Sequence, residues 1–418
     1  TDAELFEATD RLVAWYRRIW HIHFELLVPA LVGISTFQDV YQDLFPDSGP
    51  LDAYRLLQGF DSMSLEAGRE LWTLSRTVKA NPGLREVFEN TAPNELAGRL
   101  ASIDAGRAFL ADFSAYLAFY GRRSDGVQEL AAPSWTEDPT PAFTNLKAYL
   151  DQDEDPDARH ARLAAERETL VRRAREAIAS YPAPVRDQFE LLLAAGAAAS
   201  RVQEDHNFWI DQRSLHEVRQ LCLEYGRRLV NGGMLREPHE VLLLTMDEAQ
   251  ELLRSGGDAN QMVAERRAEM AYWSMITPPP MIGMDYGPPP DNPVTRAISR
   301  FFGPPPQAAE TPGDLQGNAG SPGTARGIAR VVMSIAESSR LHHGEILVAP
   351  TTAPPWTPLF ATAAAVVTDT GGVLSHCAIV AREYGIPAAV GVPGATSIIK
   401  DGMTIEVDGS RGTVRILS

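Results

Sequence analysis

The sequence predicts a multidomain protein of the α and α/β classes, in which a large, mostly helical domain precedes a compact α/β domain. Length is the first observation behind this prediction, since 418 residues exceed one hydrophobic core at roughly 150 residues per domain. The second is a proline-rich break, and the third is a change of apolar spacing across it. We expect a helical domain at residues 1–276, a proline-rich linker at 277–317 and the α/β domain at 318–418.

The first unit shows apolar residues at the three-to-four spacing of amphipathic helices. Leu5, Leu12 and Tyr16 follow this spacing near the start of the chain. Thr245 and Glu248 match an N-cap residue and its N3 partner, so a further helix is expected to begin there. These patterns predict a mostly α domain.

The linker contains three runs of three prolines, which begin at Pro278, Pro288 and Pro304. Consecutive prolines exclude helix interiors and central strands, because they lack backbone N–H groups. A short apolar helix pattern around residues 294–302 indicates that part of the linker docks on a domain.

The last hundred residues contain short β-rich runs with helices between some of them. One helix is expected at Ser375–Tyr384. The expected strands are Gly327–Met333, Glu345–Ala349, Ala363–Asp369, Ala388–Gly391, Thr404–Asp408 and Gly412–Leu417.

Composition narrows the classes of partner. The net charge is −17, which disfavours nucleic acid and anionic lipid as partners. Two distant cysteines predict a reducing compartment, so we expect a cytoplasmic protein. The apolar stretch Leu26–Ile34 is about half the length needed to span a bilayer, and Pro29 is expected to interrupt it, so no membrane association is predicted.

His376 is the residue with the clearest chemical context. A buried strand, a glycine turn and a helix N-terminus are predicted in that order, with His376 in the first helical turn. Unpaired amides and the helix dipole favour an anion there, and neutral imidazole is nucleophilic near pH 7. The predicted phosphate-binding groups around a phosphorylated His376 are Thr370, Gly371, Gly372, Ser375 and Arg382.

The motif around His376 resembles the mobile phosphohistidine domain of the phosphoenolpyruvate-utilising enzymes. The matching residues are Gly371-Gly372-x-x-Ser375-His376-x-Ala378-Ile379-x-Ala381-Arg382, then Gly385-Ile386-Pro387-Ala388, and the resemblance extends over about residues 318–417. Cys377 departs from the alanine common in that family, and we interpret it as a packing residue. The resemblance implies a swivelling domain whose histidine carries a phosphoryl group between two sites.

In that family one site uses Mg²⁺ and ATP. No glycine-rich phosphate loop with the G-x-x-x-x-G-K-[ST] pattern precedes the linker, so we expect a separate ATP-grasp-type subunit to bind the nucleotide. The pattern of the family releases AMP and inorganic phosphate.

The helical region around Glu204-Asp205-His206 is similar to the one that precedes the carrier domain in phenylphosphate synthase and rifampin phosphotransferase, and the Glu-Asp-His version leans toward the former. This implies phosphorylation of a phenolic hydroxyl, as in phenol degradation, with His206 as the base that removes the proton. Predicted acceptor-binding residues mix aromatic and polar groups and include Trp20, His21, His23, Glu25, Arg201, Glu204, Asp205 and Trp209. No metal site is predicted.

Several alternatives stay open at this stage. The acceptor site resembles either that of a rifampin phosphotransferase or that of the carboxylate-activating step of a condensing enzyme. In a third alternative the chain is a non-catalytic phosphohistidine docking module. For His206 and His23, a purely structural role as hydrogen-bonded core residues is also open.

Overall fold

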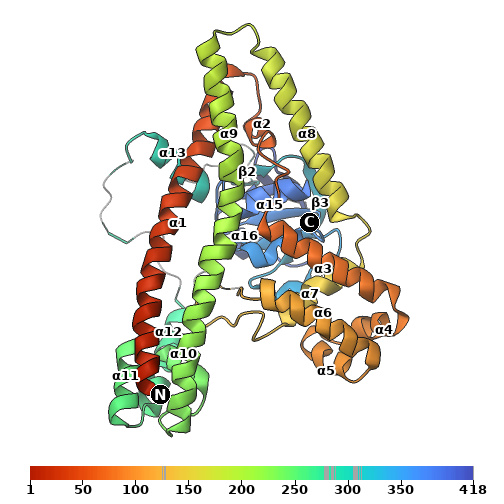
Figure 1. The fold of residues 1–418 in the computed structure, drawn as a ribbon. Coiled ribbons are helices and arrows are strands. Elements are labelled where there is room, and N and C mark those ends of the chain that lie inside the picture. Colours follow the sequence, from red (N-terminus) through yellow and green to blue (C-terminus); the bar gives the residue numbers. More distant parts are fainter. Residues whose placement is uncertain are drawn as a thin grey trace.

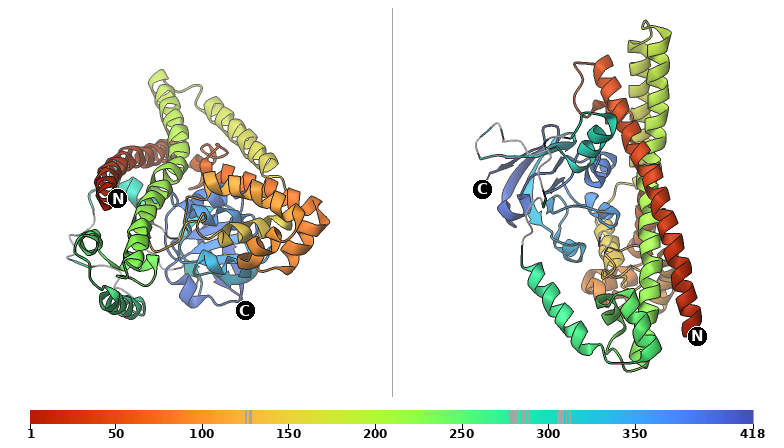
Figure 2. Two further views of the ribbon diagram at one scale, coloured as in Figure 1. Left: turned by 60° about the horizontal axis from the view of Figure 1, so that its bottom comes forward. Right: turned by 90° about the vertical axis from the view of Figure 1, so that its left-hand side faces the viewer.

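A computed structural model describes residues 1–417 apart from 125, 127–128, 277–281, 284–286, 288, 305–308, 310 and 312. Two long helices dominate it, α1 (Asp2–Leu44) and α9 (Ala183–His206). They run side by side in opposite directions, and the α/β domain lies to one side of the pair (Figures 1 and 2). Thr1 and Glu4 form a capping box that starts α1, and an apolar cluster containing Ile34, Phe37 and Phe189 fills the space between the two helices.

The other helices of the first unit form two groups. One surrounds a core of Phe88, Phe113, Phe143 and Trp135, and the other extends the lower end of α9. The first group comprises α3 (Met63–Ala80), α4 (Pro82–Asn90), η1 (Pro93–Glu95), α5 (Leu96–Ala101), α6 (Asp104–Tyr120) and α7 (Thr140–Leu150). Helix α2 (Asp52–Arg55) instead adds Ala53 and Tyr54 to the apolar cluster of α1 and α9. The second comprises a π-helical turn η2 (Asn207–Gln212), α10 (Arg213–Asn231), η3 (Pro238–Leu243), α11 (Met246–Ser255) and α12 (Asn260–Ser274), while α8 (Pro156–Ala177) leads into α9.

The α/β domain is built on a sheet of eight described strands in the order β1-β8-β7-β3-β4-β5-β6-β2. Neighbours from β3 to β6 are parallel, and antiparallel strands flank them on both sides. The strands are β1 (Leu315–Gln316), β2 (Asn318–Ser321), β3 (Thr324–Val331), β4 (Ile346–Ala349), β5 (Ala365–Thr368), β6 (Ala388–Val390), β7 (Thr404–Asp408) and β8 (Thr413–Ile416). The helical segments between them are η4 (Ile335–Arg340), η5 (Pro354–Trp356), α14 (Thr357–Phe360), α15 (His376–Tyr384) and α16 (Ala395–Ile398).

The predicted fold class is confirmed, and so are the six predicted strands and the helix at 375–384, to within a few residues at each end. The predicted cap is also confirmed, because the Thr245 hydroxyl accepts from the Glu248 amide at the start of α11. The sheet includes β1 within the segment predicted to be linker, since Leu315 and Gln316 pair with Val414 and Thr413.

Part of the linker docks, as the apolar pattern predicts. Helix α13 (Pro293–Phe302) lies against α1 and buries Ala297. The Asp39 carboxylate pairs with Arg296 at 3.1 Å and also with Arg300. The first proline run, Pro278–Pro280, lies outside the described residues, as do parts of the other two.

The α/β domain is docked on the helical unit through both apolar and polar contacts, and Leu374 joins the apolar cluster of Ile34 and Leu57. The Gln203 amide donates to the Leu374 carbonyl at 2.7 Å, and the Gly59 N–H donates to both oxygens of Glu383 at 2.9 and 3.1 Å. On the other side, the Gln152 amide donates to the Thr362 hydroxyl at 3.3 Å. These contacts bring the N-terminus of α15 next to the last turn of α9.

The expected interruption of α1 at Pro29 is wrong, because the helix continues through this residue. Proline removes one helical hydrogen bond, and packing of α1 along α9 outweighs that cost. Among the described residues, α1 is long and apolar enough to cross a membrane, and 28% of its most apolar window is buried inside the protein. Core helices of soluble proteins also meet these criteria of length and composition.

The contact between α13 and the glycine turn generates a prediction. A β-carbon on Gly372 would lie 2.2 Å from the Arg300 carbonyl oxygen and 2.7 Å from the Gly303 nitrogen, both backbone atoms. Gly372→Ala should lower the free energy of unfolding by ~1–3 kcal/mol, the usual cost of overpacking.

Chemical denaturation of the two proteins measures this change. Gly98→Ala is the matched control, because no atom lies within 4 Å of its new β-carbon, and it should leave stability unchanged or slightly raised. Equal stability of Gly372→Ala and the parent would contradict the observed packing.

Candidate functional site

The site begins at the N-terminus of α15, which follows strand β5 and the glycine turn. Ser375 is the N-cap residue and His376 the first residue of the helix. The first amides of a helix have no partner within it, so the end of α15 carries partial positive charge beside the imidazole. The Gly372 and Leu374 amides are already occupied, since each donates at 2.9 Å to a carbonyl at the end of α13.

The His376 imidazole faces a carboxylate of the helical unit. Its Nδ1 lies 3.4 Å from Glu204 Oε2, and both side chains are largely buried, with exposed fractions of 14% and 9%. Because the carboxylate only accepts, this contact favours the tautomer that carries its proton on Nδ1. The unprotonated Nε2 is then the nucleophilic nitrogen.

Burial acts to raise the pKa of Glu204, but its contacts with the His376 imidazole and the Ser64 hydroxyl outweigh burial and hold the pKa below its usual value. The carboxyl is therefore ionised near neutral pH. A buried carboxylate beside one imidazole nitrogen is the arrangement that orients a catalytic histidine.

Several buried polar atoms at this interface have no hydrogen-bond partner. They are Gln203 Oε1, Ser375 Oγ and His376 Nε2, together with Glu204 Oε2, whose 3.4 Å contact with His376 Nδ1 does not have hydrogen-bond geometry. Unsatisfied buried groups are rare in folded proteins, and when they gather they mark a site that binds something polar. A cavity of about 40 Å³ adjoins two of these residues, Gln203 and Glu204, and is also lined by Leu374 and Arg382. It has room for a few waters and not for an aromatic ring.

The predicted phosphate-binding residues divide into two groups. Gly371, Gly372 and Ser375 belong to the glycine turn that leads into α15, whereas Thr370 and Arg382 donate hydrogen bonds to backbone carbonyls of the same domain. Ser375 and Gly371 touch each other, because a β-carbon on Gly371 would lie 2.9 Å from Ser375 Oγ, and Gly372 lies under α13. The Thr370 hydroxyl donates to the Pro350 carbonyl at 3.2 Å. Arg382 is buried and donates to the Gly320 and Val373 carbonyls, and burial lowers its pKa to about 10. The structure thus gives Arg382 a positioning role within the domain.

The predicted acceptor-binding residues do not form a single cluster. His21 and Glu25 pair with each other at 3.1 Å on the exposed face of α1, away from His23. Trp20 packs on His23 with ring centroids 4.6 Å apart. Asp205 accepts from the Met63 amide at 2.8 Å at the start of α3.

The remaining two predicted residues take part in cation–π contacts. The Arg201 guanidinium lies over the Phe60 ring at 5.1 Å. Trp209 is about half exposed and stacks with Arg213.

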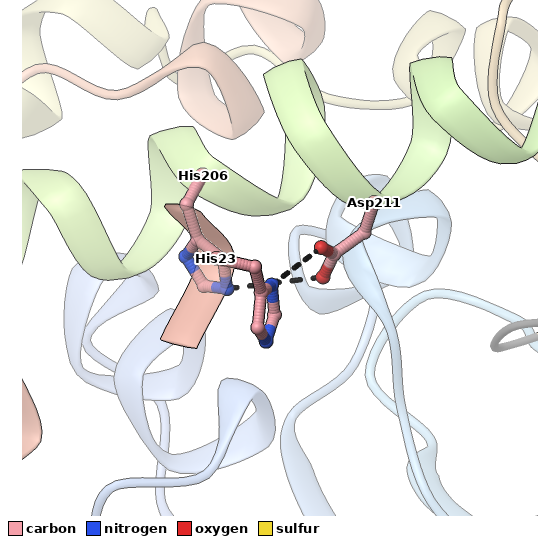
Figure 3. Close-up of side chains that lie close together, drawn as sticks. All are labelled: His23, His206 and Asp211. Carbon is pink, nitrogen blue, oxygen red and sulfur yellow. Dashed lines mark hydrogen bonds and ion pairs between the residues drawn. The ribbon is translucent and has the colours of Figure 1, made fainter. Parts of the chain in front are cut away.

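A second buried cluster joins His206 to His23 and to Asp211, which sequence reasoning missed (Figure 3). His23 Nδ1 lies 2.8 Å from Asp211 Oδ1, and His206 Nε2 lies 3.8 Å from Asp211 Oδ2. His206 and Asp211 are five residues apart, which the π-helical turn η2 brings to one side of the helix. An α-helix would separate them, so the sequence carries no simple signal for this pairing.

Two further titratable groups of α15 are buried. Burial raises the pKa of the Cys377 thiol to about 12, which supports its interpretation as a packing residue. Burial also raises the pKa of Glu383 to about 7, although the Gly59 N–H and the Arg382 charge act in the opposite direction.

A larger cleft of about 390 Å³ lies at another part of the domain interface, between α3, α4, α7 and η4. Its lining includes Lys79, Arg85, Lys147 and His342. Its volume is in the range of small-molecule sites, but His376 and Glu204 do not line it.

Comparison with known proteins identifies both parts of the chain. Residues 341–412 match the mobile domain of the PEP-utilising enzymes, and residues 24–204 match the fourth domain of rifampicin phosphotransferase. The chain belongs to the phosphoenolpyruvate-utilising enzyme family, rifampicin phosphotransferase type. His376 lies within the matched mobile domain, and Glu204 is the last residue of the other match.

The curated relatives of this family member are longer proteins. Chondramide synthase cmdD of Chondromyces crocatus is 42% identical over 96% of this chain and 10% of its own length. An uncharacterised phosphotransferase of Bacillus subtilis, YvkC, is 31% identical over 100% of the chain and 50% of its own length. A rifampicin phosphotransferase of a Streptomyces species is 31% identical over 86% of this chain and 40% of its own length. The chain thus spans half or less of each of these relatives.

The raised pKa of Glu383 predicts the direction in which the stability of the protein changes with pH. Between the ordinary glutamate pKa of 4.5 and about 7, the folded protein holds a proton that the unfolded chain has released, so stability falls as pH rises through this window. Glutamine does not titrate, so Glu383→Gln escapes this loss. The free energy of unfolding of the variant minus that of the parent should therefore increase from about pH 5 to about pH 8.

Urea unfolding across this pH range measures the difference. Glu7→Gln, on the exposed face of α1, should follow the parent at every pH. A stability difference for Glu383→Gln that stays constant with pH would show that Glu383 is already ionised at pH 5.

Proposed function

We propose that this chain is the phosphohistidine-carrying, acceptor-binding part of an ATP-dependent phosphotransferase. The observation that carries the proposal is the buried His376 imidazole, with Nδ1 held by Glu204 and Nε2 without a partner, at a helix N-terminus. Membership of the family and the names of the phosphotransferase relatives support it.

In the first step, His376 Nε2 attacks the β-phosphorus of ATP, a P–N bond replaces the P–O bond to AMP, and AMP leaves. Water then cleaves the remaining β–γ P–O–P linkage, which releases inorganic phosphate and leaves one phosphoryl group on Nε2. We propose that a separate ATP-grasp-type subunit holds the Mg–ATP for this step. The dianionic adduct on Nε2 points away from Glu204, because the two ring nitrogens face diverging directions, and the partial positive charge of the α15 N-terminus stabilises it.

In the second step, an acceptor hydroxyl attacks phosphorus, the P–N bond breaks and the imidazole leaves in its neutral form. The acceptor's proton passes to a base of the helical unit. Glu204 lies at Nδ1, on the side of the ring away from the phosphoryl group, so we assign it the orientation of His376 and not the removal of this proton. His206 is not assigned this role either, because its Nε2 faces Asp211 Oδ2 at 3.8 Å within the buried cluster with His23.

We propose a phenol as the acceptor. Its hydroxyl has a pKa near 10, so a base positioned in the transition state assists its deprotonation. Since the cavity beside Glu204 is about 40 Å³, the acceptor enters when the carrier domain moves away from α9. The polar contacts between the two units suit such a movement.

A carboxylate acceptor is the second candidate. Two of the similar proteins are named as synthesising enzymes, chondramide synthase and the prodigiosin synthesizing transferase of Serratia marcescens, the latter 33% identical over 84% of this chain. Phosphorylation of a carboxylate would give an acyl phosphate, which hydroxylamine traps. A phenyl phosphate is inert to hydroxylamine, so this reagent separates the two candidates.

The carrier role predicts labelling of a single residue. With an ATP-binding subunit of the family and ATP labelled in its β- and γ-phosphates, the chain should take up acid-labile label, and His376→Ala should take up none. His343→Ala, which alters an exposed histidine of the same domain, should be labelled like the parent. Equal labelling of His376→Ala and the parent would remove the proposal.

The role of Glu204 predicts a loss of rate without a loss of fold. Glu204→Gln keeps the shape but removes the charge that orients the His376 ring, so transfer from phosphorylated His376 to an active acceptor should slow on the order of 10²-fold. Single-turnover release of label, with Glu7→Gln as control, measures this. Transfer from Glu204→Gln at the parent rate would contradict the role of Glu204.

A panel of a simple phenol, a rifamycin macrocycle and an aryl carboxylic acid with hydroxylamine identifies the acceptor class. Release of label by none of the phenols would exclude the aryl acceptor.

A further inference from the structure

The buried cluster of His23, His206 and Asp211 lies outside the phosphotransfer machinery proposed above. His23 comes from α1, while His206 ends α9 and Asp211 lies in the π-helical turn that follows (Figure 3). The exposed fractions of the three residues are 6%, 9% and 6%, and one nitrogen or oxygen of each lies within 4.8 Å of the others.

The hydrogen bonds of His206 fix which of its nitrogens faces the cluster. Its Nδ1 lies 3.0 Å from the Val202 carbonyl oxygen, which can only accept, so Nδ1 carries the proton. In the neutral ring, Nε2 then presents a lone pair to Asp211 Oδ2, 3.8 Å away. That distance is too long for a hydrogen bond, so two electron-rich atoms face each other in a buried space.

The Asp211 carboxylate is held in place by its other contacts. Its Oδ1 lies 2.8 Å from His23 Nδ1, and its Oδ2 accepts from the Asn207 amide at 3.2 Å. Trp20 and Phe24 pack on the His23 ring with centroid distances of 4.6 and 4.8 Å. The Val202 carbonyl and the Asn207 amide are outer contacts of the kind that orient metal ligands.

We propose that His23, His206 and Asp211 bind one divalent transition-metal ion of the Zn²⁺ type. Two imidazoles and one carboxylate are a common ligand set for such ions, and three protein ligands leave at least one position open. Tetrahedral bonds of 2.0–2.1 Å place ligand atoms ~3.3 Å apart. The observed separations of 2.8 and 3.8 Å between the Asp211 oxygens and the two imidazoles lie on either side of this value.

The location of this site gives it a structural consequence. A metal ion bound there ties α1 to the end of α9, two residues beyond Glu204. It also stabilises the π-helical turn, because two of its ligands lie five residues apart across that turn. The ion therefore supports the part of α9 that faces His376.

Zinc binding to the chelator-treated full chain tests the site directly. Calorimetric titration should give one Zn²⁺ per chain, and Zn²⁺ should raise the melting temperature. Asp211→Asn and His206→Gln should each weaken binding by more than the roughly 10- to 100-fold loss typical of outer-shell changes. His21→Gln, an exposed histidine on the same helix, should bind Zn²⁺ like the parent.

Circular dichroism of each variant separates loss of ligand from loss of fold, and Co²⁺ absorption in the visible range provides a second measure of coordination. The proposal is overturned if the parent chain binds no Zn²⁺. It is also overturned if the folded Asp211→Asn and His206→Gln variants bind Zn²⁺ as tightly as the parent, or if His21→Gln loses the site. The three groups would then form a hydrogen-bonded cluster with a protonated His206.

Discussion

The contact between the His376 imidazole and the Glu204 carboxylate is the interaction on which the rest of this account depends. It joins two domains, because His376 begins α15 and Glu204 lies in the last turn of α9. It also selects the tautomer, since a carboxylate beside Nδ1 leaves Nε2 as the nucleophile. The long α1–α9 pair, the docked α13 and the glycine turn all serve to hold these two side chains in register.

The interface around this contact positions His376 next to Glu204 and still allows the two domains to separate. Its hydrogen bonds come from side chains and backbone groups such as Gln203 and Gly59, and it buries a carboxyl, Glu383, whose pKa is raised to about 7. Burying such groups costs free energy that hydrophobic interfaces do not incur. The interface also contains apolar contacts such as that of Leu374 with the cluster of Ile34 and Leu57. Interfaces of such mixed character between domains resemble those of transient complexes, which suits a domain that carries a group between two sites.

Much of the α/β domain could be predicted from the sequence, because its short apolar runs, glycine turns and helix signals are local. The position of His376 at the start of α15 followed from the same local pattern. The opposite faces of His21 and His23 could also have been read from the sequence, since residues two apart on a helix point about 200° apart. The exposed pair of His21 and Glu25 has the ordinary four-residue spacing.

Contacts between distant segments could not be predicted in this way. The approach of Glu204 to His376 depends on how two domains dock, and no periodicity encodes it. The pairing of His206 with Asp211 depends on a π-helical turn, which differs from an α-helix by one residue per turn and has no distinctive composition. The predicted interruption at Pro29 was wrong because the local effect of proline on α1 is outweighed by the packing of α1 along α9.

The position of the phosphoryl group on the His376 ring tests the central claim most directly. After phosphorylation of the chain, ¹⁵N–³¹P correlation in ring-labelled protein identifies the nitrogen that is bonded to phosphorus. The contact with Glu204 predicts phosphorus on Nε2, with a proton on Nδ1. Phosphorus on Nδ1 would show that this nitrogen does not face Glu204 in the reacting protein, and would contradict the account.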